Sequence, residues 1–129
     1  MNLISFRKII PVILWMLIIL VLSGYPGEKL PEVPVWQIDK LVHTFIYGVL
    51  SILTFFSFKK QLMDGNLRLK TGCWIVLFVI FYGGLMEILQ MSIFINRSGN
   101  WQDFIANSLG AFLGLIIFPV IIKFIPVKR

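Results

Sequence analysis

The sequence predicts an all-α integral membrane protein, with four transmembrane helices in a compact bundle and both termini in the cytoplasm. The 129 residues are 58% hydrophobic and only 14% charged, and their mean hydropathy is +0.90. A soluble domain of this length cannot bury so much apolar surface. Four apolar segments are separated by short polar ones, and most basic residues lie at alternate ends of these segments. The length fits a single membrane domain over residues 1–129.

The apolar segments place the four spans at residues 7–23, 41–58, 73–95 and 101–125. Their lengths are close to the ~20 residues that cross a bilayer as a helix. The first segment includes Arg7 and Lys8 before an apolar run, which could also be part of a signal peptide. We interpret it as a retained span, because its removal would leave an odd number of spans and disrupt the charge pattern described next.

The basic residues indicate how the spans are oriented. Only Lys29, Lys40 and Arg97 lie in the segments that join the first span to the second and the third span to the fourth. The other nine lie at the opposite ends of the spans: Arg7, Lys8, Lys59, Lys60, Arg68, Lys70, Lys123, Lys128 and Arg129. The positive-inside rule then places both termini in the cytoplasm. Because the bases follow the span ends, the net charge of +6 does not lead us to expect a nucleic-acid partner.

Eight polar residues are predicted to lie together on the outer side of the membrane. Asp39, His43 and Tyr47 are spaced four apart at the start of the second span, so they share one helix face. The others lie at the outer ends of the third and fourth spans and in the loop between them: Glu87, Gln90, Arg97, Asp103 and Asn107. We predict that the eight residues line one outward-facing polar pocket.

The cost of burying charge gives this pocket its expected centre. A charge near the middle of the bilayer costs on the order of 3 kcal/mol, so Glu87 should face the bundle interior, with Arg97 or His43 as its partner. We expect four residues at the centre of the pocket: Glu87, His43, Arg97 and Asp103. Asp39 would orient His43, and the wall would be lined by Tyr47, Gln90 and Asn107.

A purely structural role is open for each of these residues taken alone. Asp39 and Asp103 could cap the amino ends of their helices. Tyr47 could belong to an aromatic belt at the membrane interface, and Gln90 and Asn107 could join neighbouring helices. We favour the shared pocket, because these polar residues come from separate helices and lie on the same side of the membrane.

The sequence gives no indication of a cofactor. The single cysteine, Cys73, excludes an internal disulfide and cannot hold a metal cluster alone. No spacing matches a metal motif such as H-E-x-x-H. One histidine and three carboxylates could hold a hard metal ion or act as acids and bases, so the sequence leaves metal binding open.

The polar residues stand in segments that resemble the VanZ-like family. The segments are D-K-x-x-H-x-x-x-Y at residues 39–47, E-x-x-Q at residues 87–90, the arginine Arg97, and D-x-x-x-N-x-x-G-A at residues 103–111. The resemblance runs from Asp39 to Gly114, in the order of the family's pattern. Thr44 departs from it, since an aromatic residue commonly follows the histidine, and this departure concerns packing more than the polar residues.

The resemblance implies a small multi-pass protein of the bacterial plasma membrane. The family's namesake is associated with resistance to the lipoglycopeptide antibiotic teicoplanin, without a change in the peptidoglycan precursor terminus that such drugs bind. The resemblance thus implies which residues act together, and a link to the cell envelope, but no particular reaction.

These observations lead to two functional hypotheses and one structural hypothesis. In the first, the pocket binds or modulates an amphiphilic ligand of the outer leaflet, such as a lipid-linked cell-wall precursor or a lipophilic antibiotic, with membrane lipids as further partners. In the alternative, the protein is a membrane enzyme that acts on a lipid-linked substrate by acid–base or metal-assisted chemistry. In the third, the polar residues only set the register of the helices. The sequence does not indicate an oligomeric state.

Overall fold

A computed structural model describes residues 3–26, 36–66, 68–94 and 99–125. Within these ranges all regular structure is helical: α1 (Leu3–Gly24), α2 (Trp36–Ser57), α3 (Lys59–Met63), α4 (Arg68–Ser92) and α5 (Trp101–Phe124). Four of these helices, all except the short α3, are long and apolar enough to cross a membrane. The all-α class and the four helices of spanning length are therefore confirmed.

The helices extend beyond the apolar segments from which they are predicted. α2 begins at Trp36, where the expected span begins at residue 41, and α4 begins at Arg68 instead of residue 73. The reason is that a helix keeps its backbone hydrogen bonds outside the hydrocarbon core, whereas hydropathy follows only that core. α3 lies between the second and third expected spans, where hydropathy predicts no helix.

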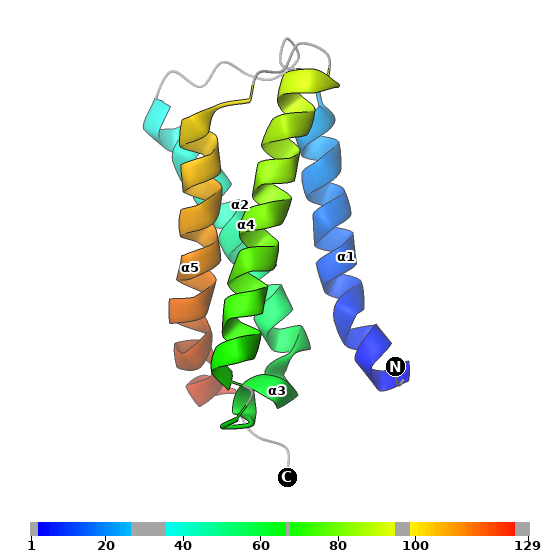
Figure 1. Cartoon of the computed structure of the whole chain (residues 1–129), viewed down its shortest axis with the longest axis vertical. Coiled ribbons are helices and arrows are strands. Elements are labelled where there is room, and N and C mark those ends of the chain that lie inside the picture. Colours follow the sequence, from blue (N-terminus) through cyan, green and yellow to red (C-terminus); the bar gives the residue numbers. More distant parts are fainter. Residues whose placement is uncertain (1–2, 27–35, 67, 95–98, 126–129) are drawn as a thin grey trace.

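The long helices run side by side and place four helix ends together (Figure 1). The starts of α2 and α5 and the ends of α1 and α4 lie at one end of the molecule, which we call the upper end from its position in Figure 1. The start of α1, the short α3, the start of α4 and the end of α5 lie at the lower end. Segments far apart in the sequence therefore meet at the upper end, where most of the predicted polar residues are found.

Small residues bring α2 and α5 into close contact. A Cβ atom on Gly110 would lie 2.5 Å from the carbonyl oxygen of Thr44, and one on Gly114 would overlap the side chain of Ser51. The Ser51 hydroxyl donates to the carbonyl oxygen of Ala111 at 2.8 Å. Helices in lipid associate through this kind of packing and hydrogen bonding, because the hydrophobic effect does not favour protein over lipid contacts. The close α2–α5 contact thus fixes the relative positions of the side chains that these two helices carry.

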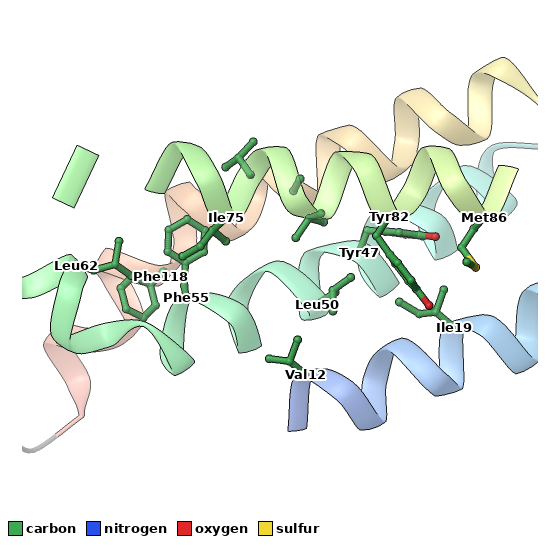
Figure 2. Close-up of a cluster of buried hydrophobic side chains, with 13 residues drawn as sticks. Val12, Ile19, Tyr47, Leu50, Phe55, Leu62, Ile75, Tyr82, Met86 and Phe118 are labelled. Atoms are coloured by element: carbon green, nitrogen blue, oxygen red, sulfur yellow. The ribbon is translucent and has the colours of Figure 1, made fainter. Parts of the chain in front are cut away.

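The buried apolar side chains fill the space between the helices (Figure 2). Leu50 of α2 and Val79 of α4 are fully buried. Phe55 of α2 packs against Phe118 of α5, with ring centroids 5.3 Å apart. These contacts join α2, α4 and α5 along their length, below the polar residues of the upper end.

Two side-chain hydrogen bonds attach α1 to its neighbours. Trp15 Nε1 donates to the carbonyl oxygen of Ile46 in α2 at 2.9 Å. The Tyr82 hydroxyl of α4 donates to the carbonyl oxygen of Met16 at 2.6 Å. Because no water is available in hydrocarbon, such donors need acceptors within the protein. α1 is therefore held against both α2 and α4.

Candidate functional site

The first turns of α2 and α5 bring two aspartates together at the upper end. α2 begins at Trp36, so Asp39 lies inside its first turn. The N-cap of α5 is Asn100, whose side chain accepts a hydrogen bond from the backbone N–H of Gln102 at 2.9 Å. Asp103 therefore does not cap its helix, and the capping alternative is wrong for this residue. A carboxylate in the first turn is stabilised by the positive end of the helix dipole.

A lysine joins the two aspartates across the α2–α5 contact. Lys40 Nζ donates to Asp39 Oδ2 at 2.9 Å and also to Asp103 Oδ1. The side chains of Lys40 and Asp103 are only 14% and 12% exposed, whereas that of Asp39 is 50% exposed. His43 Nε2 lies 3.8 Å from Asp39 Oδ1 and 3.8 Å from Asp103 Oδ2. We call these four residues the ion cluster.

A second set of contacts leads from the ion cluster into the interior. His43 Nδ1 lies 2.9 Å from Asn107 Oδ1, and Asn107 Nδ2 donates to Glu87 Oε1 at 3.4 Å. Glu87 Oε2 accepts a hydrogen bond from the backbone N–H of Asn100 at 3.0 Å. Asn107 is fully buried and Glu87 is 5% exposed. We call the series His43, Asn107, Glu87 and Asn100 the relay.

The relay determines which nitrogen of His43 carries its proton. The amide nitrogen of Asn107 is used by the Glu87 carboxylate, which can only accept, so the amide oxygen of Asn107 faces His43. That oxygen can only accept as well, so His43 Nδ1 is the donor. In the neutral imidazole, Nε2 then carries a lone pair, and this nitrogen faces the two aspartates of the ion cluster.

Of the two partners that the sequence predicts for Glu87, only His43 lies within the described residues. Arg97, the first expected partner, lies outside the described residues. His43, the second expected partner, is linked to Glu87 through the side chain of Asn107, which lies on α5 between α4 and α2. Among the described residues the hydrogen bonds to Glu87 come from neutral amides, one in the Asn107 side chain and one in the Asn100 backbone.

Two of the predicted wall residues, Tyr47 and Gln90, are buried between the helices. Tyr47 is 3% exposed within the hydrophobic core, and its ring centroid is 6.5 Å from that of Tyr82. Gln90 is also buried, and its Nε2 donates to the carbonyl oxygen of Ser23 in α1 at 3.3 Å. The alternative of an interfacial tyrosine is therefore wrong for Tyr47, and Gln90 joins helices, as its structural alternative proposes.

Several residues that organise the site do not stand out in the sequence. Lys40 is part of the D-K-x-x-H pattern, but the sequence analysis uses it only to count outer bases. Gly83 lets Asn107 approach α4, since a Cβ atom there would lie 3.0 Å from Asn107 Cβ. Gly99 serves the same purpose next to Glu87, whose carbonyl oxygen would be 2.5 Å from an added Cβ. Only the position of Lys40 beside an aspartate at a helix start could have indicated its role.

Larger hollows lie elsewhere on the molecule and are apolar. One of about 630 Å³ is lined by α1, α2 and α4, with Val12, Thr54 and Trp74 among its residues. Another, of about 760 Å³, is lined by α2, α4 and α5 with Phe55 and Phe118. None of the seven predicted pocket residues that the structure describes lines either hollow. The described polar residues of the upper end therefore lie apart from these two hollows.

The ion cluster has the residue types of a cation or acid–base site. Asp39, His43 and Asp103 each offer one ligand atom, and these three atoms lie within 4.8 Å of one another. Imidazole and carboxylate are ligands for first-row divalent ions, and an imidazole with an oriented nitrogen is also a common general base. The cluster is reachable from outside, since Asp39 is half exposed.

The comparisons with known proteins give one match. A family model described as VanZ/LLP1 matches residues 1–123, which include every residue of the ion cluster and the relay. No curated protein and no solved structure matches the chain.

Proposed function

The chain belongs to the VanZ/LLP1 family, and from that premise we propose that it binds the polar headgroup of an amphiphilic ligand at the ion cluster. One observation carries this proposal. Charged side chains from two helices gather at one end of a membrane protein and remain partly exposed there. Ionisable groups in membrane-spanning segments are costly, so such a cluster is expected to have a functional role.

The exposed apolar surface of the same helix turns suits the apolar part of such a ligand. Leu41 and Phe45 of α2 are 67% and 68% exposed, and Ile105 of α5 is 55% exposed. An amphiphile could therefore place its headgroup at the aspartates, lysine and histidine while its chain lies along these helices in the lipid.

The charges of the lower end support an outer-leaflet position for this site. Among the described residues, seven bases lie at the lower end: Arg7, Lys8, Lys59, Lys60, Arg68, Lys70 and Lys123. The positive-inside rule then favours a cytoplasmic lower end and an external ion cluster, in the plasma membrane of a bacterium. The ligand would be a lipid-linked cell-wall precursor or a lipophilic antibiotic of the teicoplanin type, which would account for a role in the cell envelope or in resistance.

Photolabelling tests this proposal. The probe is a polyprenyl phosphate with a diazirine in its first isoprene units, in liposomes of phosphatidylethanolamine and phosphatidylglycerol that contain the full chain. We expect labels near Leu41, Phe45 and Ile105, and reduced labelling in Asp39→Asn and His43→Ala. Asp64→Asn, the same change of acid to amide in an exposed turn at the lower end, should label like the wild type. Uniform labelling of the four long helices would contradict the proposal.

A membrane enzyme is the second candidate, and the relay favours it. Asn107 and Glu87 are buried and hold His43 in one orientation, with Nε2 toward the ligand side. Such support of an accessible imidazole is typical of general acid–base catalysis. Purified protein would then convert a polyprenyl phosphate or phospholipid, and both His43→Ala and Glu87→Gln would lose turnover. Labelling without any turnover would favour binding over catalysis.

A further inference from the structure

We infer that Asp39, His43 and Asp103 form a binding site for one divalent transition cation, of the class of Mn²⁺ or Zn²⁺. The inference rests on the proposed function, since the cation would lie where the headgroup binds and would supply the positive charge that a phosphate requires. It adds a metal to a chain whose sequence contains no metal motif.

The distances in the ion cluster are those of ligands around an ion. His43 Nε2 is 3.8 Å from Asp39 Oδ1 and from Asp103 Oδ2, which is longer than a hydrogen bond. Two ligand atoms about 2.1 Å from a tetrahedral ion lie about 3.4 Å apart. The three groups thus converge without bonding to each other, and a small inward movement would complete the coordination.

The oxygen atoms are divided between Lys40 and the proposed ion. Lys40 binds Asp39 Oδ2 and Asp103 Oδ1, whereas the other oxygen of each carboxylate faces His43. Lys40 therefore orients both carboxylates and occupies neither of the oxygens that face the imidazole. The ion and the lysine could be bound at the same time.

The relay prepares His43 as a metal ligand. Histidines that bind metals usually donate their second N–H to a carbonyl or carboxylate, which fixes the ring and the tautomer. His43 Nδ1 meets the amide oxygen of Asn107 at 2.9 Å, and Asn107 is held in turn by Glu87. In the neutral imidazole the remaining nitrogen presents its lone pair to two carboxylates, an arrangement that repels unless a proton or a metal ion lies between them.

The types of ligand also favour a transition cation. A mixed set of imidazole and carboxylate ligands suits Mn²⁺ or Zn²⁺ better than it suits ions that prefer oxygen ligands alone. Three protein ligands would leave coordination positions open for a phosphate oxygen.

Metal binding by the full chain in detergent tests the inference without any lipid ligand. After removal of metals with EDTA, Mn²⁺ is titrated and the free ion is followed by electron paramagnetic resonance. We expect saturation at one Mn²⁺ per chain and nitrogen couplings from one imidazole in the pulsed spectrum. Asp39→Asn and Asn107→Ala should weaken binding by more than about tenfold, and His43→Gln should also remove the nitrogen couplings. Asp64→Asn should leave binding unchanged.

The half-exposed Asp39 makes Asp39→Asn the variant that is safest for folding, and circular dichroism of each variant checks its helix content. Absence of saturable Mn²⁺ binding in the wild type, or wild-type affinity in both Asp39→Asn and His43→Gln, would overturn the inference. Photolabelling by the polyprenyl phosphate probe, once with added Mn²⁺ and once in EDTA, separates the two proposals. Labelling in a chain that does not bind Mn²⁺ means that only the metal site is wrong. Mn²⁺ binding without labelling in the presence of added Mn²⁺ means that the proposed lipid ligand is wrong.

Discussion

Asn107 is the residue through which α2, α4 and α5 are connected at the site. Its amide accepts from His43 with one end and donates to Glu87 with the other. It is fully buried, so each half of the amide needs its partner. An amide can link an imidazole donor to a carboxylate because its oxygen accepts and its nitrogen donates.

Glu87→Gln is expected to destabilise the protein through this connection. Glu87 accepts from two donors, the Asn107 side chain and the Asn100 backbone. Glutamine has only one oxygen, so its NH₂ group would face one of these donors and leave it without an acceptor. We expect a loss of about 1–3 kcal/mol, measured by SDS-induced unfolding of the detergent-solubilised protein. Asp64→Asn is the matched control with an expected change within about 0.5 kcal/mol. Equal stability of Glu87→Gln and the wild type would show that the relay is not formed.

Lys40→Met tests whether the lysine links α2 to α5. Lys40 and Asp103 are mostly buried, so removal of the ammonium leaves a buried carboxylate without its charged partner. We expect a loss of at least about 2 kcal/mol in the same unfolding measurement, since breaking a buried ion pair costs several kcal/mol. Lys60→Met, an exposed lysine at the lower end, should change stability by less than about 1 kcal/mol.

A double-mutant cycle completes this test. Asp103→Asn in the Lys40→Met background should cost much less than Asp103→Asn alone, because the interaction has already been lost. Additive losses would mean that the two residues act independently, and the ion pair would then not contribute to stability.

At the residue scale, the sequence predicts most of the site's chemical groups but not their connections. Polar residues in apolar helices are costly, so those of the site can be identified from the sequence. They are Asp39, His43, Glu87, Asp103 and Asn107. Which of them bond depends on how far each helix is rotated and shifted against its neighbours. That arrangement follows from long-range packing, so the bridging position of Asn107 is visible only in the structure.

At the scale of the elements, the α2–α5 contact positions the ion cluster. Gly110 faces the backbone of α2, where an added Cβ atom would lie 2.5 Å from Thr44 O and 2.7 Å from Gly48 N. Backbone atoms cannot move aside as a flexible side chain can. A methyl group at this position would therefore separate the two helices and with them His43 and Asn107.

Gly110→Ala should accordingly lose both stability and the site. We expect a loss of about 1–3 kcal/mol, the usual cost of overpacking, together with weaker photolabelling by the polyprenyl phosphate probe. Gly65→Ala is the control, because nothing lies within 4 Å of a Cβ atom there. Full stability and labelling in Gly110→Ala would show that α2 and α5 do not pack as closely as described.

The helices themselves are largely predictable, and their pairing is not. Four long apolar segments give four helices of spanning length, because a helix satisfies its own backbone hydrogen bonds in lipid. The first residues of α2 and α4, and the short α3, lie outside the apolar segments, so hydropathy does not predict them. The pairing of α2 with α5 depends on small residues such as Gly110 and Gly114, which are too common in membrane helices to identify a partner.

At the scale of the whole molecule, the two ends carry different charges. The described lower end has seven basic side chains, several of them exposed, whereas the described lysine of the upper end is bound within the ion cluster. Bases in short cytoplasmic segments resist translocation. In the proposed orientation, with a cytoplasmic lower end, the acidic cluster would lie on the outer side, where the proposed ligand would be met.

Cysteine labelling of intact cells tests this orientation. In a Cys73→Ser background, Asn66→Cys places a thiol in the exposed turn between α3 and α4, and Gln102→Cys places one at the exposed start of α5. With a membrane-impermeant maleimide we expect Gln102→Cys to react in intact cells and Asn66→Cys to react only after permeabilisation. Both variants should react fully once the membrane is opened, which controls for accessibility of the thiols. The reverse pattern would place the ion cluster in the cytoplasm, and its ligand would then belong to the inner leaflet.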